Sequence, residues 1–289
     1  MNVNVNVYVD LVKKIRICDN LTTVSTTEGD GPILLGMPHG GTHLPHEIST
    51  GLNARGRLLA DADWHIGRLY EGLLPSATVV AANFHRYLID ANRDPSGQSL
   101  YPGQNTTEIC PTIDFDGEPI WQEGHAPDAD EVAQRITHWH RPYHAALEAQ
   151  LQRIKARHGI AILYDCHSIR PVAPFLFEGR LPDFNIGTNG TTTCAPAIEQ
   201  MVADTCAEIC AATGQTMVVN GRFKGGWTTR HYGRPQDGIH AIQMELAQDL
   251  YMDLDPPFAF DAVKAEPLQK GLATILARLE QLALSGALS

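Results

Sequence analysis

Two short apolar runs constrain the fold of this chain more than any other feature of its sequence. Residues 33–35 and 160–164 are apolar and too short for a helix, and Gly and Pro close the first of them. Such runs predict strands buried on both faces, as in a parallel sheet covered by helices. His39 follows the first run and His167 follows the second. Because ligands collect at the carboxyl ends of strands in α/β sheets, we expect both imidazoles at the same edge.

The rest of the chain alternates between strand patterns and helix patterns. Strands are predicted at residues 3–9, 77–81, 87–89, 216–219 and 239–246, and helices at 58–74, 129–157, 195–212 and 262–284. Pro142 is expected to kink or divide the helix at 129–157. Irregular loops are predicted at 94–127, 168–193 and 220–238. This interleaving favours an α/β fold with helices on both faces of one sheet. Without a repeat or linker, residues 1–289 are predicted to form a single domain.

Composition excludes several classes of function. A net charge of −11 disfavours nucleic acid and anionic membranes as partners. No run reaches the roughly 18 apolar residues that a membrane span needs. The first residues lack the basic and continuously apolar segments of a secretory signal, and the six cysteines form no C-x-x-C pair. We therefore expect free thiols in a soluble cytoplasmic protein.

His39 and His167 are the first candidates for metal binding. A catalytic zinc site needs three protein ligands and one open position, and two histidines with a carboxylate form a common set. Asp63 is the favoured carboxylate, with Asp61 as its rival and His65 as a weaker candidate. These residues predict a divalent metal site that could activate water.

A second histidine pair offers an alternative metal site. His140 and His144 lie four residues apart, with His138 close by, so the first two would share one face of a helix. No H-E-x-x-H motif accompanies them, which favours a packed or solvated helix face. His43 and His46, beside the first motif, are expected either to contact the metal ligands or to be loop residues.

Charged residues elsewhere predict an anionic substrate and a general base. Asp-x-Asn-Arg at residues 90–93 follows an apolar triplet, and arginine suits the capture of a carboxylate. The glycine-rich stretch 221–234 is basic within an acidic protein. Glu245 lies in a largely apolar strand, where burial would raise its pKa and suit proton transfer. The absence of G-x-S-x-G, P-loop and G-x-G-x-x-G motifs disfavours serine hydrolase and nucleotide chemistry.

Several motifs in order resemble the N-formylglutamate deformylase (N-formylglutamate amidohydrolase) family. They are residues 37–45, 61–70, 86–93, 101–104, 165–170, 187–189, 220–226, 229–233 and 244–246. The family is related to zinc carboxypeptidases and aspartoacylase. The resemblance implies a three-layer α/β/α fold of the phosphorylase/hydrolase type with a mixed central sheet. It also implies the last step of a histidine degradation route, the hydrolysis of N-formyl-L-glutamate.

The resemblance also implies roles for individual residues. It places Zn²⁺, or another divalent metal, at His39, Asp63 and His167 and makes Glu245 the base. Arg86 matches an arginine that stabilises the oxyanion. Asn92 and Arg93 match the substrate-carboxylate motif, and Arg222, Lys224 or Arg230 would hold the second carboxylate, with His231 as an orienting group. Zinc carboxypeptidases and aspartoacylase have a Glu three residues after the first His, where this chain has Thr42. The choice between Asp63 and Asp61 therefore stays open at this stage.

Two other functions fit the same residues. One is a metal-dependent amidohydrolase acting on another N-acyl amino acid, and the other is a metal- or anion-binding module without enzymatic activity. The sequence does not specify the oligomeric state or the metal used in the cell.

Overall fold

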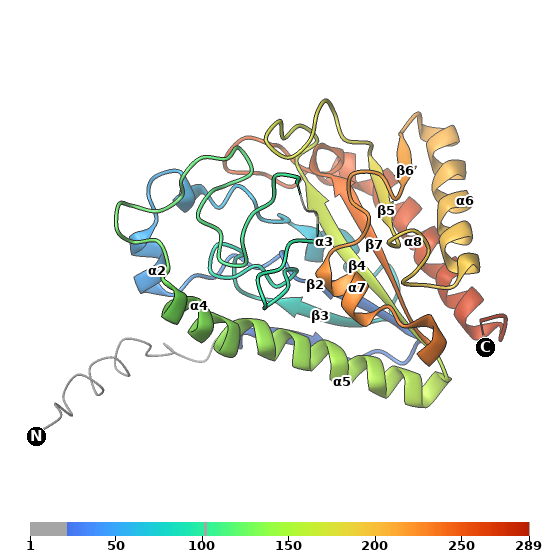
Figure 1. Ribbon diagram of the computed structural model, residues 1–289. Coiled ribbons are helices and arrows are strands. Elements are labelled where there is room, and N and C mark those ends of the chain that lie inside the picture. The colour runs from blue at the N-terminus through green and yellow to red at the C-terminus, as the bar shows by residue number, and fades with distance from the viewer. Residues whose placement is uncertain (1–21, 101–102, 289) are drawn as a thin grey trace, which may run out of the picture.

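A computed structural model describes residues 22–100 and 103–288 of the chain. Its centre is a mixed seven-stranded sheet in the order β1-β3-β2-β4-β7-β5-β6 (Figure 1). The strands are β1 Val24–Thr27, β2 Ile33–Met37, β3 Thr78–Ala82, β4 Ala161–Ile169, β5 Phe184–Gly187, β6 Met217–Val219 and β7 Ile239–Ala247. β1 pairs with β3, and β5 with β7, in antiparallel orientation, while the other pairings are parallel.

Helices cover both faces of this sheet. They are α2 His46–Gly51, α3 Ile66–Tyr70, α4 Ala129–Arg135, α5 Arg141–His158, α6 Pro196–Thr213, α7 Trp227–Tyr232 and α8 Ala262–Leu284. Short helical segments occur at η1 Gly56–Leu58, η2 Ile136–His140, η3 Pro235–Asp237 and η4 Gln248–Leu250. In Figure 1, α5 runs along one side of the sheet, and α6 and α8 lie together on the other. The predicted three-layer α/β/α fold with a mixed sheet is confirmed.

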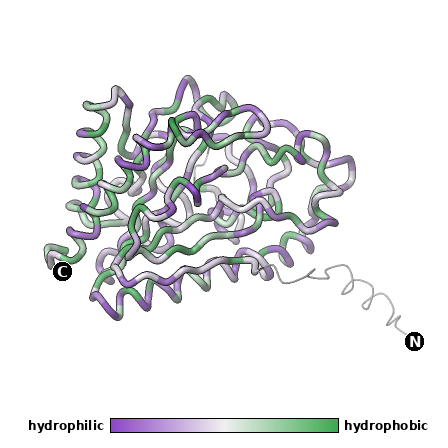
Figure 2. The backbone as a smooth tube through the Cα atoms, turned by 180° about the vertical axis from the view of Figure 1, so that it is seen from behind, coloured by the Kyte–Doolittle hydropathy of each residue, from purple (hydrophilic) through white to green (hydrophobic). Residues whose placement is uncertain are grey.

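The alternation of side chains in the central strands divides the core in two. Ile162 and Tyr164 of β4 pack in the core cluster that contains α6 and α8, whereas Ala161 and Leu163 pack in the cluster that contains α5. The central strands are mostly hydrophobic, and polar and apolar residues alternate along the outer helices (Figure 2). This is the pattern expected for a sheet buried on both faces.

β4 is longer than the apolar run that predicted it. All nine of its residues are buried, and it continues through Asp165 and His167 to Ile169. His167 therefore lies on the face of the sheet, near the carboxyl end of β4, and not in a loop beyond the strand. Glu245 lies beside it, because the register of β4 and β7 pairs His167 with Glu245 and Asp165 with Gln243.

The predicted helix at residues 58–74 is mostly wrong. Only Gly56–Leu58 and Ile66–Tyr70 are helical. Leu59 and His65 have φ angles of 54° and 62°, so the backbone between them makes turns that no α-helix allows. The predicted strand at 87–89 is also wrong, because the segment forms a turn in which the Leu88 amide donates to the His85 carbonyl.

Other predictions hold in part. Residues 129–158 form helices that meet at a π-helical segment, Ile136–His140, just before Pro142. Among the described residues of 94–127 there is no helix or extended strand, as predicted. β1, β5, α2 and α7 were not predicted, and His46, for which a loop position was expected, is the first residue of α2. The strand expected at 3–9 lies outside the described residues, and the assignment of residues 1–289 to one domain stays a prediction. No helix in the described ranges is long and apolar enough to cross a membrane.

Candidate metal and substrate site

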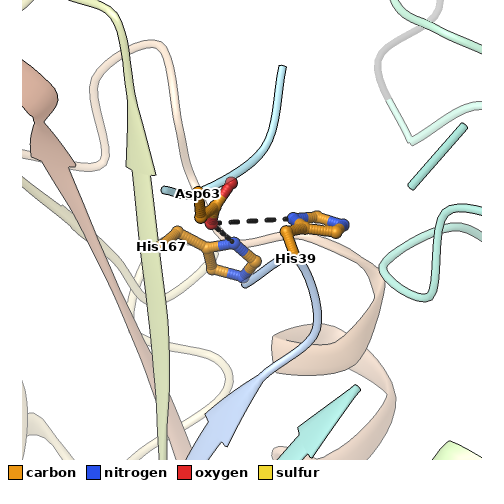
Figure 3. Close-up of side chains that lie close together, drawn as sticks. All are labelled: His39, Asp63 and His167. Carbon is orange, nitrogen blue, oxygen red and sulfur yellow. Dashed lines mark hydrogen bonds and ion pairs between the residues drawn. The ribbon is translucent and has the colours of Figure 1, made fainter. Parts of the chain in front are cut away.

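Three residues from separate parts of the chain meet at the carboxyl ends of the central strands. His39 lies two residues beyond β2, His167 lies in β4, and Asp63 lies in the turn before α3. One ligand atom from each residue lies within 4.8 Å of the other two, and all three side chains are buried (Figure 3). The Asp63 amide donates to the His39 carbonyl at 3.1 Å, which ties the two loops together.

The orientation of both imidazoles suits a metal ion. Nδ1 of His39 and Nδ1 of His167 face Oδ2 of Asp63 at 3.8 Å and 3.2 Å. The outer nitrogens face carboxylates: Nε2 of His39 lies 2.7 Å from Asp90, and Nε2 of His167 lies 3.2 Å from Asp165. For His39, the carboxylate behind the imidazole keeps the proton on the outer nitrogen and leaves the inner lone pair for a metal. In the described chain, Nδ1 of His39 is buried without a hydrogen-bond partner.

The electrostatics of the group favour a bound cation. Burial alone would raise the pKa of Asp63, but His167 and His39 hold that pKa below its ordinary value. Burial alone would lower the pKa of His167, but Asp165 and Asp63 hold it well above the usual range. The imidazole is thus surrounded by negative charge that a proton or a divalent cation would neutralise. The two nitrogens and the carboxylate oxygen form a donor set typical of zinc.

Two carboxylates of the site, Asp90 and Asp165, were not among the residues predicted from the sequence. Asp90 is fully buried, and it contacts His39, the Arg86 guanidinium at 2.6 Å and the Asn92 amide at 2.8 Å. Asp165 also accepts a hydrogen bond from the Thr229 hydroxyl at 2.8 Å. A signal for Asp165 was present in the sequence, since residues two apart in a strand share one face. Nothing in the sequence placed Asp90 behind His39.

Glu245 is positioned on β7, directly beside His167. Burial raises the pKa of Glu245 to about 8, although the neighbouring His167 opposes this shift. The Gln243 side chain donates to Oε2 of Glu245 at 3.2 Å and accepts from the Gly226 amide at 2.7 Å. A buried carboxylate whose pKa is near neutral can both accept and return a proton.

Arg86 is the buried cation of the site. Its guanidinium pairs with Asp90 and lies 3.7 Å from Oδ1 of Asp63. The Phe115 ring packs on the guanidinium, with 4.7 Å between the ring centroid and Cζ. The guanidinium is therefore fixed beside the histidine–aspartate group, where it can donate to an oxygen of a bound molecule.

These residues open into one cavity. Its walls are formed by His39, Asp63, Arg86, Asn92, Arg93, Asn105, Thr106, Phe115, His167, Ser168, Ile169, Leu176, Arg222, Phe223, Gly226, Gln243 and Glu245. Arg93 is held by donation to the Thr107 carbonyl at 3.0 Å, and Arg222 by donation to the Leu176 carbonyl at 3.0 Å. Asn92 lies 3.1 Å from Nε2 of His167 and accepts from the Thr228 amide.

Three residues predicted to bind substrate do not line this cavity. Lys224 is exposed, because the loop turns so that Arg222 and Phe223 face the cavity instead. Arg230 and His231 lie in α7, a helix that the glycine-rich sequence did not predict. Arg230 donates to the Gly225 carbonyl, and the exposed His231 stacks on Trp227 with ring centroids 4.3 Å apart. The sequence alone could not show which basic residues of this loop turn inward.

The rival metal ligands have other contacts. Oδ2 of Asp61 accepts from the Phe115 amide at 2.9 Å, and burial raises the pKa of Asp61 to about 6. Nε2 of His65 lies 2.7 Å from the Phe258 carbonyl. His140 and His144 direct Nε2 at the backbone carbonyls of Arg93 and Ala91. Within residues 22–100 and 103–288, His39, Asp63 and His167 form the one group of three or more His, Cys, Asp or Glu residues that could hold a metal ion.

Comparisons with known proteins point to one family. The family model described as N-formylglutamate amidohydrolase matches residues 31–252. The chain is 44% identical to an N-formylglutamate deformylase of Pseudomonas aeruginosa over 257 residues, which cover 89% of this chain and 95% of the relative. A relative of the same name from Pseudomonas putida is 43% identical over the same length, with the same coverage of both chains.

A solved structure also resembles the described fold. The N-formylglutamate amidohydrolase from Ralstonia eutropha JMP134 matches with a TM-score of 0.76 and 26% sequence identity. The match covers 92% of this chain and 100% of that one. The family model, the sequence relatives and this solved structure therefore point to the same family.

Proposed function

Because the chain belongs to the N-formylglutamate amidohydrolase family, we propose that it hydrolyses N-formyl-L-glutamate to formate and L-glutamate with the aid of a bound divalent metal. This reaction is the last step of a histidine degradation route. The observation that supports it best is the convergence of the histidine–aspartate group, a buried glutamate and inward-facing arginines in one cavity.

His39, Asp63 and His167 are the proposed ligands of the metal, and Zn²⁺ is the favoured ion for this donor set. A zinc ion held by these residues would supply a Lewis acid for the formyl carbonyl and would lower the pKa of water toward about 7. Asp90 contacts the outer nitrogen of His39, and Asp165 and the Asn92 side chain lie beside the outer nitrogen of His167, which keeps both Nδ1 atoms directed at Asp63. Their contribution is orientation of the ligands.

Glu245 is the proposed general base and acid. Its carboxylate takes a proton from the attacking water as the new C–O bond forms at the formyl carbon. The same carboxyl group then returns the proton to the amide nitrogen as the C–N bond breaks, so glutamate leaves as a neutral amine. Burial raises the pKa of Glu245 in the metal-free protein, and a carboxyl group whose pKa lies above its ordinary value can both accept and return a proton. Arg86 donates to the carbonyl oxygen, where negative charge develops during the attack.

The arginines of the cavity explain how an acidic protein could bind a dicarboxylate. Arg93 and Asn92 are proposed to hold one carboxylate of the substrate and Arg222 the other, since all three line the cavity. Lys224, Arg230 and His231 are left out of this proposal because they do not line the cavity.

The proposal can be tested by measuring formate release and metal content in the same samples. His167→Ala should lose bound metal and formate release together, because one of three ligands is gone. His138→Ala is the matched control: His138 is exposed and outside the cavity, so metal content and activity should stay at the wild-type level. Metal-loaded wild-type protein that releases no formate would refute the proposed function. A preference for N-acetyl over N-formyl amino acids would assign it to another N-acyl substrate.

A further inference from the structure

The cavity has an apolar wall beside Arg86 and His167. Phe115 packs on the Arg86 guanidinium, and Ile169 lies two residues after His167 on the same face of β4. Both side chains line the cavity, and with Leu181 they belong to one small apolar cluster. Of the groups suited to bind carboxylates, Arg93 donates to the Thr107 carbonyl, and Arg222 donates to the carbonyl of Leu176, which packs at the margin of this cluster.

The chemistry of the proposed reaction directs one part of the substrate toward this wall. The carbonyl oxygen must face Arg86, and the carbonyl carbon must lie within reach of Glu245. The glutamate portion extends from the nitrogen toward Arg93 and Arg222. The remaining substituent of the carbonyl carbon, a hydrogen in a formyl group and a methyl in an acetyl group, is then left to face Phe115 and Ile169.

From this arrangement we infer that Phe115 and Ile169 determine the size of the acyl group and restrict the enzyme to formyl substrates. The inference rests on the proposed function. It also gives Asp61 a role, because Asp61 accepts a hydrogen bond from the Phe115 amide at 2.9 Å and so holds the backbone of Phe115 in place. Phe115 is 5% exposed and Ile169 is 5% exposed, so neither side chain can swing into solvent without breaking packed contacts.

The test compares N-formyl-L-glutamate with N-acetyl-L-glutamate. Phe115→Ala and Ile169→Ala should each raise the ratio of kcat/KM for acetyl over formyl substrate by at least about tenfold, because one methyl group in a close-fitting pocket changes selectivity by about 10–200-fold. Any disturbance of Arg86 in Phe115→Ala affects both substrates, so it largely cancels in the ratio. The inhibition constant of N-acetyl-L-glutamate against the formyl substrate gives a second readout that needs no turnover of the acetyl compound.

Leu181→Ala is the matched control. Leu181 belongs to the same apolar cluster and is also buried, but it does not line the cavity. This variant should loosen the cluster without enlarging the cavity, so its acetyl-to-formyl ratio should stay at the wild-type value. If Phe115→Ala does not fold, Phe115→Leu and Ile169→Ala test the same point.

The outcomes separate this inference from the function on which it rests. A wild-type protein that holds metal and releases no formate refutes the function. A wild-type protein that releases formate, with variants at Phe115 and Ile169 that change neither the ratio nor the inhibition constant, refutes the inference alone. A rise in the ratio that Leu181→Ala matches would also refute it, because general loosening would then explain the effect.

Discussion

Replacing Glu245 with Gln should slow turnover and, in metal-free protein, stabilise the fold at alkaline pH. Glu245 is buried beside Asp63, and burial raises its pKa from 4.5 to about 8. The folded protein therefore binds more protons than the unfolded chain between these two pH values. Its free energy of unfolding must fall as the pH rises through this window.

The size of this effect follows from the shift in pKa. Each pKa unit corresponds to about 1.4 kcal/mol, so an ionised Glu245 costs the fold a few kcal/mol, with roughly 5 kcal/mol as an upper limit. Gln keeps the shape of the side chain and can still accept from Gln243, but it carries no charge. The variant and the wild type should have similar stability near pH 5, and the variant should be more stable by a few kcal/mol near pH 9.

Urea unfolding of chelator-treated protein at several pH values would measure the difference. Glu123→Gln, at an exposed position, is the matched control and should follow the wild type throughout. In the metal-loaded protein, Glu245→Gln should bind metal normally yet release formate about 10²–10⁴-fold more slowly, the usual contribution of a general base. If the free energy of unfolding changes in parallel for the variant and the wild type from pH 5 to 9, burial does not raise the pKa of Glu245. Near-normal turnover by metal-loaded Glu245→Gln would refute the role of Glu245 as the base.

Three further substitutions test other parts of the site. Arg93→Ala should raise KM for N-formyl-L-glutamate by about tenfold or more, since a charge-assisted contact is lost; equal weakening with a formyl amino acid amide that lacks carboxylates would contradict the role. Arg86→Ala should lower kcat for formate release by about 10²–10³-fold, as loss of one oxyanion donor does elsewhere; a change confined to KM would argue against it. Asp165→Asn should weaken metal binding about 10–100-fold in chelator competition, because it removes the charge behind His167; unchanged affinity would exclude that function.

The sequence predicted the layered fold because its central strands are apolar on both faces. Exposing the apolar residues 33–35 and 160–164 to water would be unfavourable, so both faces of their strands had to be covered. The helix patterns elsewhere in the chain predicted the covering layers. The same runs located His39 and His167, since ligand-binding residues in such sheets follow buried strands. The resemblance to the family, and not periodicity, supplied the roles of Arg86 and Asn92.

The turn that carries Asp63 could not be predicted in the same way. Residues 58–74 have apolar positions at helical spacing, but the left-handed backbone at Leu59 and His65 overrides that pattern. Asp63 is buried in this turn. The conformation of the turn depends on contacts with residues distant in sequence, such as Ser168, whose backbone amide donates to the Asp63 carboxylate at 3.1 Å. Local spacing contains no information about such partners. For the same reason, it could not predict that the Lys224 side chain is exposed and does not line the cavity.

The pairing of His167 with Glu245 across adjacent strands has a consequence for how such an enzyme could change. Neighbouring strands lie about 4.8 Å apart, and hydrogen bonds along their whole length hold this spacing. The distance between a metal-binding side chain and the proton carrier is therefore built into the backbone, while Arg93, Arg222 and Phe115 stand on loops outside the sheet. Mutations in those loops could retune the choice of substrate over evolutionary time while the reactive pair kept its geometry.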